Sequence, residues 1–196
     1  LFDLVHLRQR ILEGEIDTGI CVFVEDLQSF SLEGALGGGL LGLENLFSKI
    51  DFFLTKDTPT EHHAALVALF EVLEITARAD IKSDLLQELE RQKHLLEALR
   101  KNPNVDETTL NTALGNIRST FREMLDLPGK VGEHLRENDW LMSIKQRMAI
   151  PGGCCVFDLP FYHYWLNLDT EKRHQDFKEW LGPFQPVRNA FEIVLY

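Results

Sequence analysis

Apolar residues recur at spacings of three and four along the chain from residue 43 onward, which is the pattern of amphipathic helices. Pro and Gly clusters interrupt this pattern at Pro59, Pro103, Pro128-Gly129 and Pro151-Gly152-Gly153, where helices are expected to stop. The pattern therefore predicts helices over about 43–54, 60–78, 80–99, 106–125, 132–148, 158–168, 170–181 and 186–196.

Side chains that can cap helices precede several of these segments. Asp80 or Ser83 can cap the third helix, and Asp106 or Thr108 can start the fourth. Asp158 is expected to cap the next helix, with Pro160 near its first turn. In that helix, we expect the large apolar residues to share one face, namely Phe161, Tyr164, Trp165 and Leu168.

The third helix has the clearest apolar stripe, which Gln92 interrupts at a position expected to be apolar. The stripe consists of Leu85, Leu89, Leu96 and Leu99. It fits a helix that packs within a bundle, and it also fits a seam between two copies of the chain. Two heptads are too few to distinguish a coiled coil between two copies from packing within a bundle.

Two short apolar runs predict a minor β component. Gly19–Val24 reads as a strand after a short helix over 4–13, and Cys154–Phe157 reads as a second strand. The glycines 37–39 predict a flexible connector, because ordered glycine loses the most entropy. We therefore expect a mainly α, α+β chain with an N-terminal segment 1–41, a helical domain 42–149 and a segment 150–196 that borders a β-rich domain.

Composition narrows the function classes. The 196 residues carry 20 Lys and Arg against 31 Asp and Glu, a net charge of -11, which disfavours nucleic acids and anionic membranes as partners. No apolar run approaches a membrane span, so no membrane insertion is expected. Three cysteines, two of them adjacent, suggest reduced thiols in the cytoplasm. Because the chain starts at Leu1 and ends at Tyr196 within an apolar run, we expect it to be part of a longer protein.

The stretch 130–147 departs from the acidic average, with four bases against three acids. Its Arg136, Lys145 and Arg147 could bind a peptide that carries carboxylates through charge-assisted hydrogen bonds. The alternative is a solvated helix face of mixed charge.

Catalytic and metal motifs are weak. Adjacent Cys154 and Cys155 in a strand would point to opposite faces, so a zinc site with His163 is disfavoured, and no metal is expected. A nucleophile pair of either cysteine with His163 would need an electropositive, partly exposed thiol, which no sequence feature demonstrates. Glu61-His62-His63 lacks the HExxH spacing, and both histidines are expected to be exposed.

One long string resembles the signature of the ZapD family of bacterial cell division proteins. It runs Arg147-Met-Ala-Ile-Pro-Gly-Gly-Cys-Cys-Val-Phe-Asp-Leu-Pro160 and continues to His163 and Trp165-Leu166. Further segments resemble the family's earlier helices: Ala64–Leu66, Phe70–Leu73, Arg78, Asp84–Gln92 and Leu135–Glu137. The resemblance covers about 43–195.

The resemblance implies a cytoplasmic, non-enzymatic homodimer without a cofactor. Family members have a helical and a β-rich domain. They bind the C-terminal tail of FtsZ and cross-link its filaments at the mid-cell division site, supporting Z-ring assembly and septation. A dimer with two tail sites can hold two filaments and gain avidity. The β-rich part would then lie beyond Tyr196. The alternatives are a thiol enzyme that uses Cys154 or Cys155 with His163, and a helical adaptor for another acidic partner.

The resemblance also implies a basic groove that binds the tail. By alignment its residues are Arg78, Arg136, Lys145, Arg147 and His163. Two basic family positions are replaced, by Gly42 and Asp139, which bears on tail affinity. The structural motif in the resembling string comprises Pro151, Gly152, Gly153, Cys154, Cys155 and Asp158, in which the glycines are expected to let the backbone turn.

Overall fold

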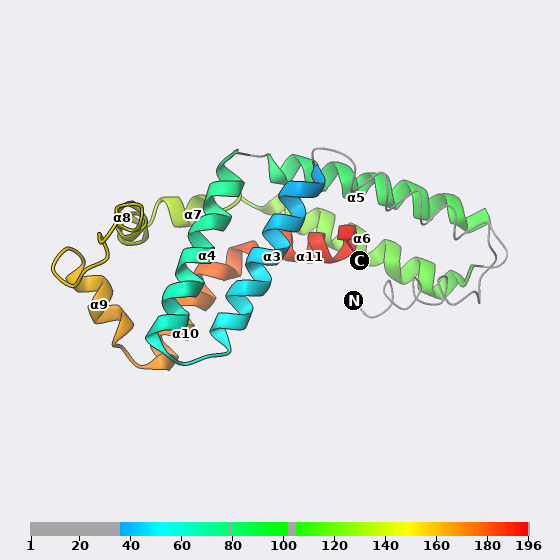
Figure 1. Cartoon of the computed structure of the whole chain (residues 1–196). Helices are drawn as coiled ribbons and strands as arrows, with labels where there is room; N and C mark the ends of the chain where they lie inside the picture. The colour runs from blue at the N-terminus through cyan, green and yellow to red at the C-terminus, as the bar shows by residue number, and fades with distance from the viewer. Residues whose placement is uncertain (1–35, 79, 102–104, 196) are drawn as a thin grey trace. The chain divides into compact units, whose positions relative to one another are not determined.

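The computed structural model describes residues 36–78, 80–101 and 105–195. Within these ranges the chain forms helices joined by turns (Figure 1). The α-helices are α3 Leu36–Leu54, α4 Pro59–Arg78, α5 Ile81–Ala98, α6 Glu107–Asp126, α7 Glu133–Arg136, α8 Asp139–Met148, α9 Pro160–Leu166, α10 Thr170–Leu181 and α11 Gln185–Leu195. Two short 3-10 helices, η1 Leu99–Lys101 and η2 Gly182–Phe184, follow α5 and α10.

The prediction of an α+β fold is wrong, because the described ranges contain no β-strand. The backbone N–H groups of Asp158 and Leu159 donate to the carbonyl oxygen of Cys155, at 3.2 and 3.1 Å, which are turn bonds rather than strand pairing. Cys154–Phe157 therefore forms turns, since no second strand lies beside it to supply ladder bonds. The helix predicted over 4–13 and the strand predicted over 19–24 lie outside the described residues.

The chain divides into two compact units. Unit 1 comprises residues 1–41, 80–128 and 186–196, and unit 2 comprises 42–79 and 129–185.

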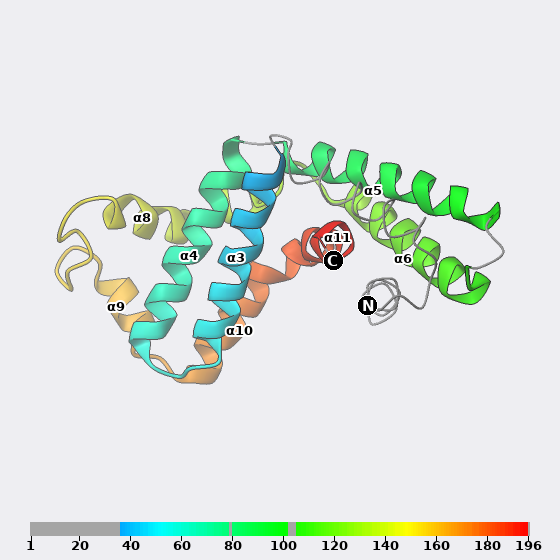
Figure 2. The same ribbon diagram turned by 45° about the vertical axis from the view of Figure 1, so that its right-hand side comes forward.

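Unit 1 is built on α5 and α6, which lie side by side in both views (Figures 1 and 2). Asp80 caps α5 by accepting from the Ser83 N–H at 3.3 Å, and Asp106 caps α6 by accepting from the Thr109 N–H at 2.8 Å. The core between the two helices includes Leu85, Leu89, Leu110, Leu114 and Ile117, all fully or almost fully buried.

Gln92, which interrupts the apolar stripe of α5, has a partner inside unit 1. Its side-chain amide donates to the backbone carbonyl of Val194 on α11 at 3.4 Å and to Glu88 Oε1 at 3.2 Å. Glu88 is itself buried and forms an ion pair with Arg91 at 2.6 Å. The interruption in the stripe thus marks a polar contact within the chain, as the bundle interpretation requires.

Unit 2 has α3 and α4 side by side and an aromatic core. All three tryptophans of the chain, Trp140, Trp165 and Trp180, lie here with ring centroids 5.7 to 5.8 Å apart. Phe177 packs against Trp165 and Trp180 with centroids at 5.8 and 5.2 Å. This cluster ties α8, α9 and α10 together.

Three local predictions differ from the structure. Helix α3 begins at Leu36 and includes the glycines 37–39, so this run is helical rather than an irregular connector. Each helical glycine costs about 1 kcal/mol, whereas burying a leucine contributes about 1.5–3 kcal/mol, and both Leu40 and Leu43 on this helix are buried. The single helix predicted over 132–148 is two helices, because Asn138 caps α8 by accepting from the Leu141 N–H at 3.1 Å.

The predicted apolar face of α9 is wrong in part: it includes Trp165, which is buried as expected, but it omits the buried Tyr162. Tyr162 and Trp165 are buried, whereas Phe161 and Tyr164 are exposed. The helix is rotated by about one residue from the expected phase. Tyr162 and Trp165 stack on each other with centroids 6.1 Å apart, and Trp165 also packs at a tilted angle against Trp180.

Candidate functional site

The loop between α8 and α9, here named the Cys-Cys loop (residues 149–159), folds back on the end of α8. The Ile150 N–H donates to the carbonyl oxygen of Arg147 at 3.0 Å, and the Gly153 N–H donates to that of Ile150 at 2.8 Å. Leu159 at the far end of the loop is buried. The loop is therefore anchored at both ends.

Gly152 and Gly153 each have a backbone reason to be glycine. Gly152 has a φ of +76°, the left-handed region that side chains disfavour. A Cβ on Gly153 would lie under 3.0 Å from the carbonyl oxygen of Arg147, which is closer than real Cβ atoms come, and 3.0 Å from that of Ile150, which is tighter than most real contacts. The turn out of α8 thus depends on both residues.

Asp158 does not cap α9 as predicted. Leu159 occupies the cap position and no side chain bonds there, although Pro160 does lie in the first turn as expected. The Asp158 Oδ2 instead accepts the Cys155 S–H at 3.2 Å. Asp158 therefore forms a hydrogen bond within the Cys-Cys loop instead of capping α9.

Arg136 is engaged inside unit 2. Its guanidinium donates to the carbonyl oxygens of Val131 at 2.8 Å and Leu73 at 3.0 Å, and to Thr76 Oγ1 at 2.8 Å. These bonds hold the end of α4 against α7, and they occupy much of the donor capacity of the guanidinium. Arg136 thus has a structural role whatever else it does.

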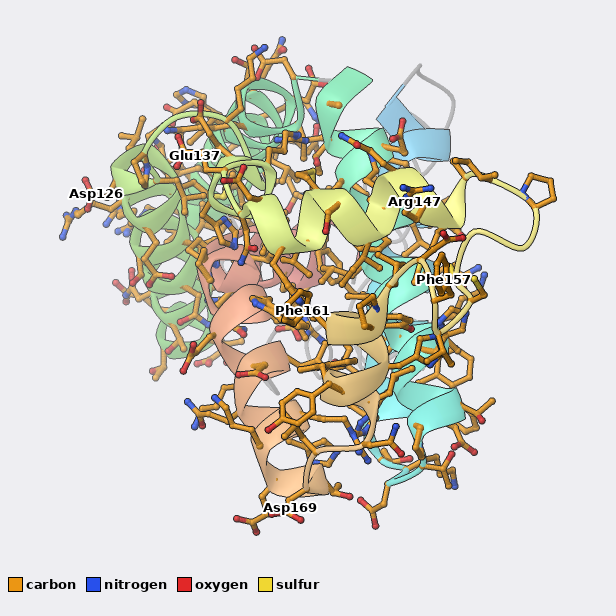
Figure 3. All side chains as sticks on the ribbon, turned by 90° about the vertical axis from the view of Figure 1, so that its left-hand side faces the viewer. Asp126, Glu137, Arg147, Phe157, Phe161 and Asp169 are labelled. Atoms are coloured by element: carbon orange, nitrogen blue, oxygen red, sulfur yellow. The ribbon has the colours of Figure 1, made fainter. Side chains whose placement is uncertain are left out.

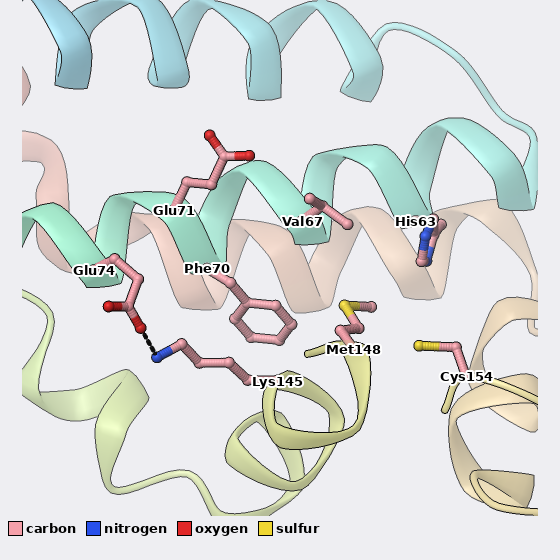
Figure 4. Close-up of a pocket in the computed structure, with 8 residues that line it drawn as sticks. All are labelled: His63, Val67, Phe70, Glu71, Glu74, Lys145, Met148 and Cys154. Carbon is pink, nitrogen blue, oxygen red and sulfur yellow. Dashed lines mark hydrogen bonds and ion pairs between the residues drawn. The ribbon is translucent and has the colours of Figure 1, made fainter. Parts of the chain in front are cut away.

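Lys145 lies on the rim of a pocket of about 320 Å³ between α4 and α8 (Figure 4). Its ammonium forms an ion pair with Glu74, the interaction dashed in the figure. Val67, Phe70 and Met148 give the pocket an apolar wall, and His63 and Cys154 lie at the end away from the ion pair. The pocket combines apolar lining with a few polar groups, as small binding sites do.

Arg147 is the exposed cation of this surface. It lies in the last turn of α8, and its guanidinium has no hydrogen bond or ion pair with any residue of the described ranges. A cation at this end of a helix is favourable beside the unpaired carbonyls, and five N–H donors remain to bind a carboxylate.

His163 binds the backbone rather than a thiol. Its Nε2 donates to the carbonyl oxygen of Cys154 at 2.7 Å, which anchors the Cys-Cys loop on α9. Burial raises the pKa of the Cys154 thiol, opposite to the shift that activates a nucleophile. Cys155 is exposed, with its S–H bonded to Asp158. The geometry for a Cys–His pair is absent among these residues.

The remaining predicted positions are Arg78, Gly42 and Asp139. Arg78 ends α4, and its side chain lies outside the described residues. Gly42 lies on α3, where a Cβ would meet only Ile75 at 3.8 Å. Asp139 is in the first turn of α8, where an acid interacts favourably with the helix N-terminus. Residues of the described ranges form no group of three or more metal-ligating side chains.

A buried polar cluster in unit 2 escaped the sequence analysis. His62 was expected to be exposed, yet it is fully buried. Its Nδ1 accepts from Arg173 Nε at 2.7 Å, and its Nε2 donates to the carbonyl oxygen of Lys56 at 2.9 Å. Burial first, and then the Arg173 cation, lower the pKa of His62. The missed signal is spacing, since His62 lies four and seven residues before the buried Leu66 and Leu69.

Arg173 is the centre of this cluster and is almost fully buried. Its guanidinium donates to the carbonyl oxygens of Asp57 at 2.6 Å, Leu166 at 2.7 Å and Leu168 at 2.5 Å. It therefore fixes the start of α4 and the loop between α9 and α10. Beside the cluster, the His63 Nδ1 lies 2.5 Å from the hydroxyl of buried Tyr162, and burial and then His163 lower the pKa of His63. Burial raises the pKa of Tyr162.

Comparison with known proteins gives one consistent result. The sequence model of the ZapD family, described as a cell division protein, matches residues 41–196. The cell division protein ZapD of Nitrosomonas europaea is 60% identical over 156 residues, which is 80% of this chain and 60% of that protein. The ZapD proteins of Nitrosomonas eutropha and Chromobacterium violaceum are 56% and 54% identical, again over 80% of this chain and 62% of theirs.

The chain thus spans about three fifths of the length of the curated relatives it matches. No helix in the described ranges has both the length and the apolar character needed to cross a membrane. Because the family model covers most of the chain and the relatives share more than half of the aligned residues, the chain belongs to the ZapD family of cell division proteins.

Proposed function

We propose that this chain binds the C-terminal tail of FtsZ, and that the protein acts as a non-enzymatic homodimer that cross-links FtsZ filaments in the cytoplasm at the division site. Membership of the ZapD family supports the role in cell division. The tail-binding surface that we propose is formed by the end of α8, the Cys-Cys loop and α9 in unit 2.

The observation that carries this proposal is the exposed guanidinium of Arg147, which has no partner in the described ranges. An exposed arginine can bind a carboxylate through two parallel hydrogen bonds. Lys145 lies two residues away and is half-buried in its ion pair with Glu74, so a tail carboxylate would have to compete with that pair. We therefore assign the direct contact to Arg147 and a secondary one to Lys145.

Arg136 and His163 fit a positioning role better than a direct one. Arg136 donates three hydrogen bonds, two to α4 and one to the turn before α7, and His163 donates to the carbonyl oxygen of Cys154. Substituting Arg136 would disturb the fold of unit 2 as well as any tail contact. It is a poor first test of binding for this reason.

The thiol-enzyme alternative has less support. The raised pKa of Cys154 keeps its thiol protonated at neutral pH, and His163 Nε2 is bonded to a backbone oxygen. A general adaptor for another acidic partner uses the same cations and differs only in the ligand. Binding of defined peptides separates it from the main proposal.

The test is titration of a fluorescent FtsZ tail peptide with the 196-residue chain, followed by anisotropy. Arg147→Glu should weaken binding by about fivefold, because exposed ion pairs contribute at most about 1 kcal/mol. Arg122→Glu on α6 is the matched control, since Arg122 is also exposed and without a partner in the described ranges, and it lies in unit 1.

Two results would contradict the proposal. One is the absence of peptide binding at low salt, where screening is weakest. The other is equal loss of affinity in the Arg147 and Arg122 variants, which would indicate only a general effect of net charge. Co-sedimentation of FtsZ polymers across ionic strength then tests bundling, and a gain in pelleted protein that falls with salt is expected.

A further inference from the structure

Large apolar side chains are gathered on the exposed side of the Cys-Cys loop and α9. Phe157 is 92% exposed, Phe161 77% and Val156 63%, and Ile150 and Tyr164 are also more than half exposed. Soluble proteins seldom leave several large apolar residues exposed on one short segment, and such patches mark interaction sites. Figure 3 shows Phe157 on the loop and Phe161 on α9, with Arg147 at the adjoining end of α8.

A folded loop presents these side chains. The backbone carbonyl of Arg147 accepts from the Ile150 N–H, so the loop that carries the patch is bonded to the last turn of α8. At the other end, the Cys155 carbonyl accepts two N–H groups and His163 holds the Cys154 carbonyl. The exposure of Phe157 is therefore a property of an anchored turn rather than of a chain end.

The charge around the patch is complementary to an acidic ligand. Between residues 140 and 168 the sequence has two cations, Lys145 and Arg147, and one acid, Asp158, but Glu74 of α4 pairs with Lys145, so Arg147 is the cation that remains available here. Asp158 is engaged with the Cys155 S–H. An apolar surface bordered by the available guanidinium of Arg147 fits a segment that carries large apolar side chains next to a carboxylate.

We propose that Phe157 and Phe161 form the apolar half of the tail-binding site, so that the bound segment is recognised by bulky apolar side chains as well as by its carboxylates. This inference rests on the proposed function, because it names the chemistry of the same ligand. Part of the binding free energy then comes from apolar burial, which salt does not screen.

The test uses the same fluorescent FtsZ tail peptide and the intact 196-residue chain at several salt concentrations. Phe157→Ala should weaken binding by about tenfold, since burying a phenylalanine is worth that much or more, and it should leave the salt dependence unchanged. Arg147→Glu should instead reduce the salt dependence. Phe52→Ala on α3 is the matched control, because Phe52 is an exposed phenylalanine of unit 2 (60%) outside the patch, and it should bind like the wild type.

Each outcome decides between the proposals. If Phe157→Ala and a second variant, Phe161→Ala, both bind like the wild type while Arg147→Glu is weakened, the apolar half is overturned and the proposed function stands. If the wild type does not bind the peptide, both fail. If Phe157→Ala leaves peptide affinity intact but lowers the mass of a self-associated species in analytical ultracentrifugation, the patch is an interface between copies and the inference is overturned.

Discussion

Replacing Gly153 with alanine should loosen the Cys-Cys loop without changing any core residue. The new Cβ would lie less than 3.0 Å from the carbonyl oxygen of Arg147, whereas ordinary contacts fall between 3.4 and 4 Å, so the backbone must shift by more than 0.4 Å. The carbonyls in its way, those of Arg147 and Ile150, are the two that accept the hydrogen bonds of the turn. Forced crowding costs about 1–3 kcal/mol and a weakened hydrogen bond about 1 kcal/mol, so we expect a loss of about 2 kcal/mol.

Gly152→Ala is the matched comparison, because its cost has a different origin. A Cβ there meets nothing within 4 Å, and only the φ of +76° is unfavourable. Left-handed backbone costs an L-residue about 1–2 kcal/mol, and asparagine tolerates it better than alanine. Gly152→Asn should therefore recover part of the loss, whereas Gly153→Asn should be at least as damaging as Gly153→Ala.

Urea unfolding followed by tryptophan fluorescence measures these effects in unit 2 alone, since Trp140, Trp165 and Trp180 all lie there. Hydrogen exchange at the loop amides reports opening that stays local. Gly153→Ala with wild-type stability and wild-type exchange would refute the steric argument. Recovery by asparagine at both positions would show that backbone conformation, and not crowding, limits residue 153.

Three further predictions concern unit 2. The pKa of His62 is lowered in the folded state, so near and below its ordinary value of 6.5 the unfolded chain binds more protons than the folded one. The contribution of His62 to the free energy of unfolding should therefore be complete above pH 6.5 and fall as the pH drops below it, by no more than about 1.4 kcal/mol per pH unit. Urea unfolding between pH 8 and 5.5 checks this, and a flat profile would contradict it. Arg173→Met should lower the free energy of unfolding by about 3 kcal/mol, since it leaves the buried His62 and three part-buried carbonyls without their donor, whereas the exposed Lys178→Met should change it by less than about 0.5 kcal/mol. Alkylation at pH 7.5, followed by mass spectrometry of peptides, should label Cys155 faster than Cys154, whose pKa is raised by burial, and the reverse order would contradict the assigned exposure.

The helices were predictable because each buries a periodic apolar stripe and several start at a side chain that can cap them. Asp80 and Asp106 both cap the helices assigned to them. The division of 132–148 into α7 and α8 was not predictable from periodicity, since Asn138 can equally lie inside a helix and only the observed bond to the Leu141 N–H makes it a cap. Capping signals therefore identify a helix start more reliably where a break in the apolar pattern accompanies them.

The prediction of the buried face of α9 failed for a different reason. Residues 161–165 are Phe, Tyr, His, Tyr and Trp, so every position carries a large ring and the pattern of apolar residues does not select a face. The structure buries Tyr162 and Trp165, whose polar tips have partners: the Tyr162 hydroxyl contacts His63 and the Trp165 Nε1–H donates to Asp176 at 2.8 Å. Partners 11 and 99 residues away decide the phase, and no local pattern contains them.

The same limit applies to the candidate site. The sequence identifies a locally basic stretch, yet Arg136 and Arg147 look alike in it. The two arginines differ in their hydrogen-bond partners: Leu73 and Thr76, which lie 63 and 60 positions before Arg136, accept its hydrogen bonds. Long-range contacts thus sort the cations into structural and available ones.

The rigidity of the Cys-Cys loop links the stability argument to the proposed site. A loop that holds Phe157 in water gains nothing from that side chain, so its turn must be stabilised by other groups: the bonds to the Arg147, Ile150 and Cys155 carbonyls and the close approach at Gly153. If the loop is preordered for a ligand, ordering it costs no free energy at the moment of binding. Gly153→Ala should then weaken binding of the FtsZ tail peptide, even though residue 153 is buried and has no side chain that could contact the peptide. A Gly153→Ala variant that opens the loop in hydrogen exchange but binds the peptide like the wild type would place the ligand elsewhere on the chain.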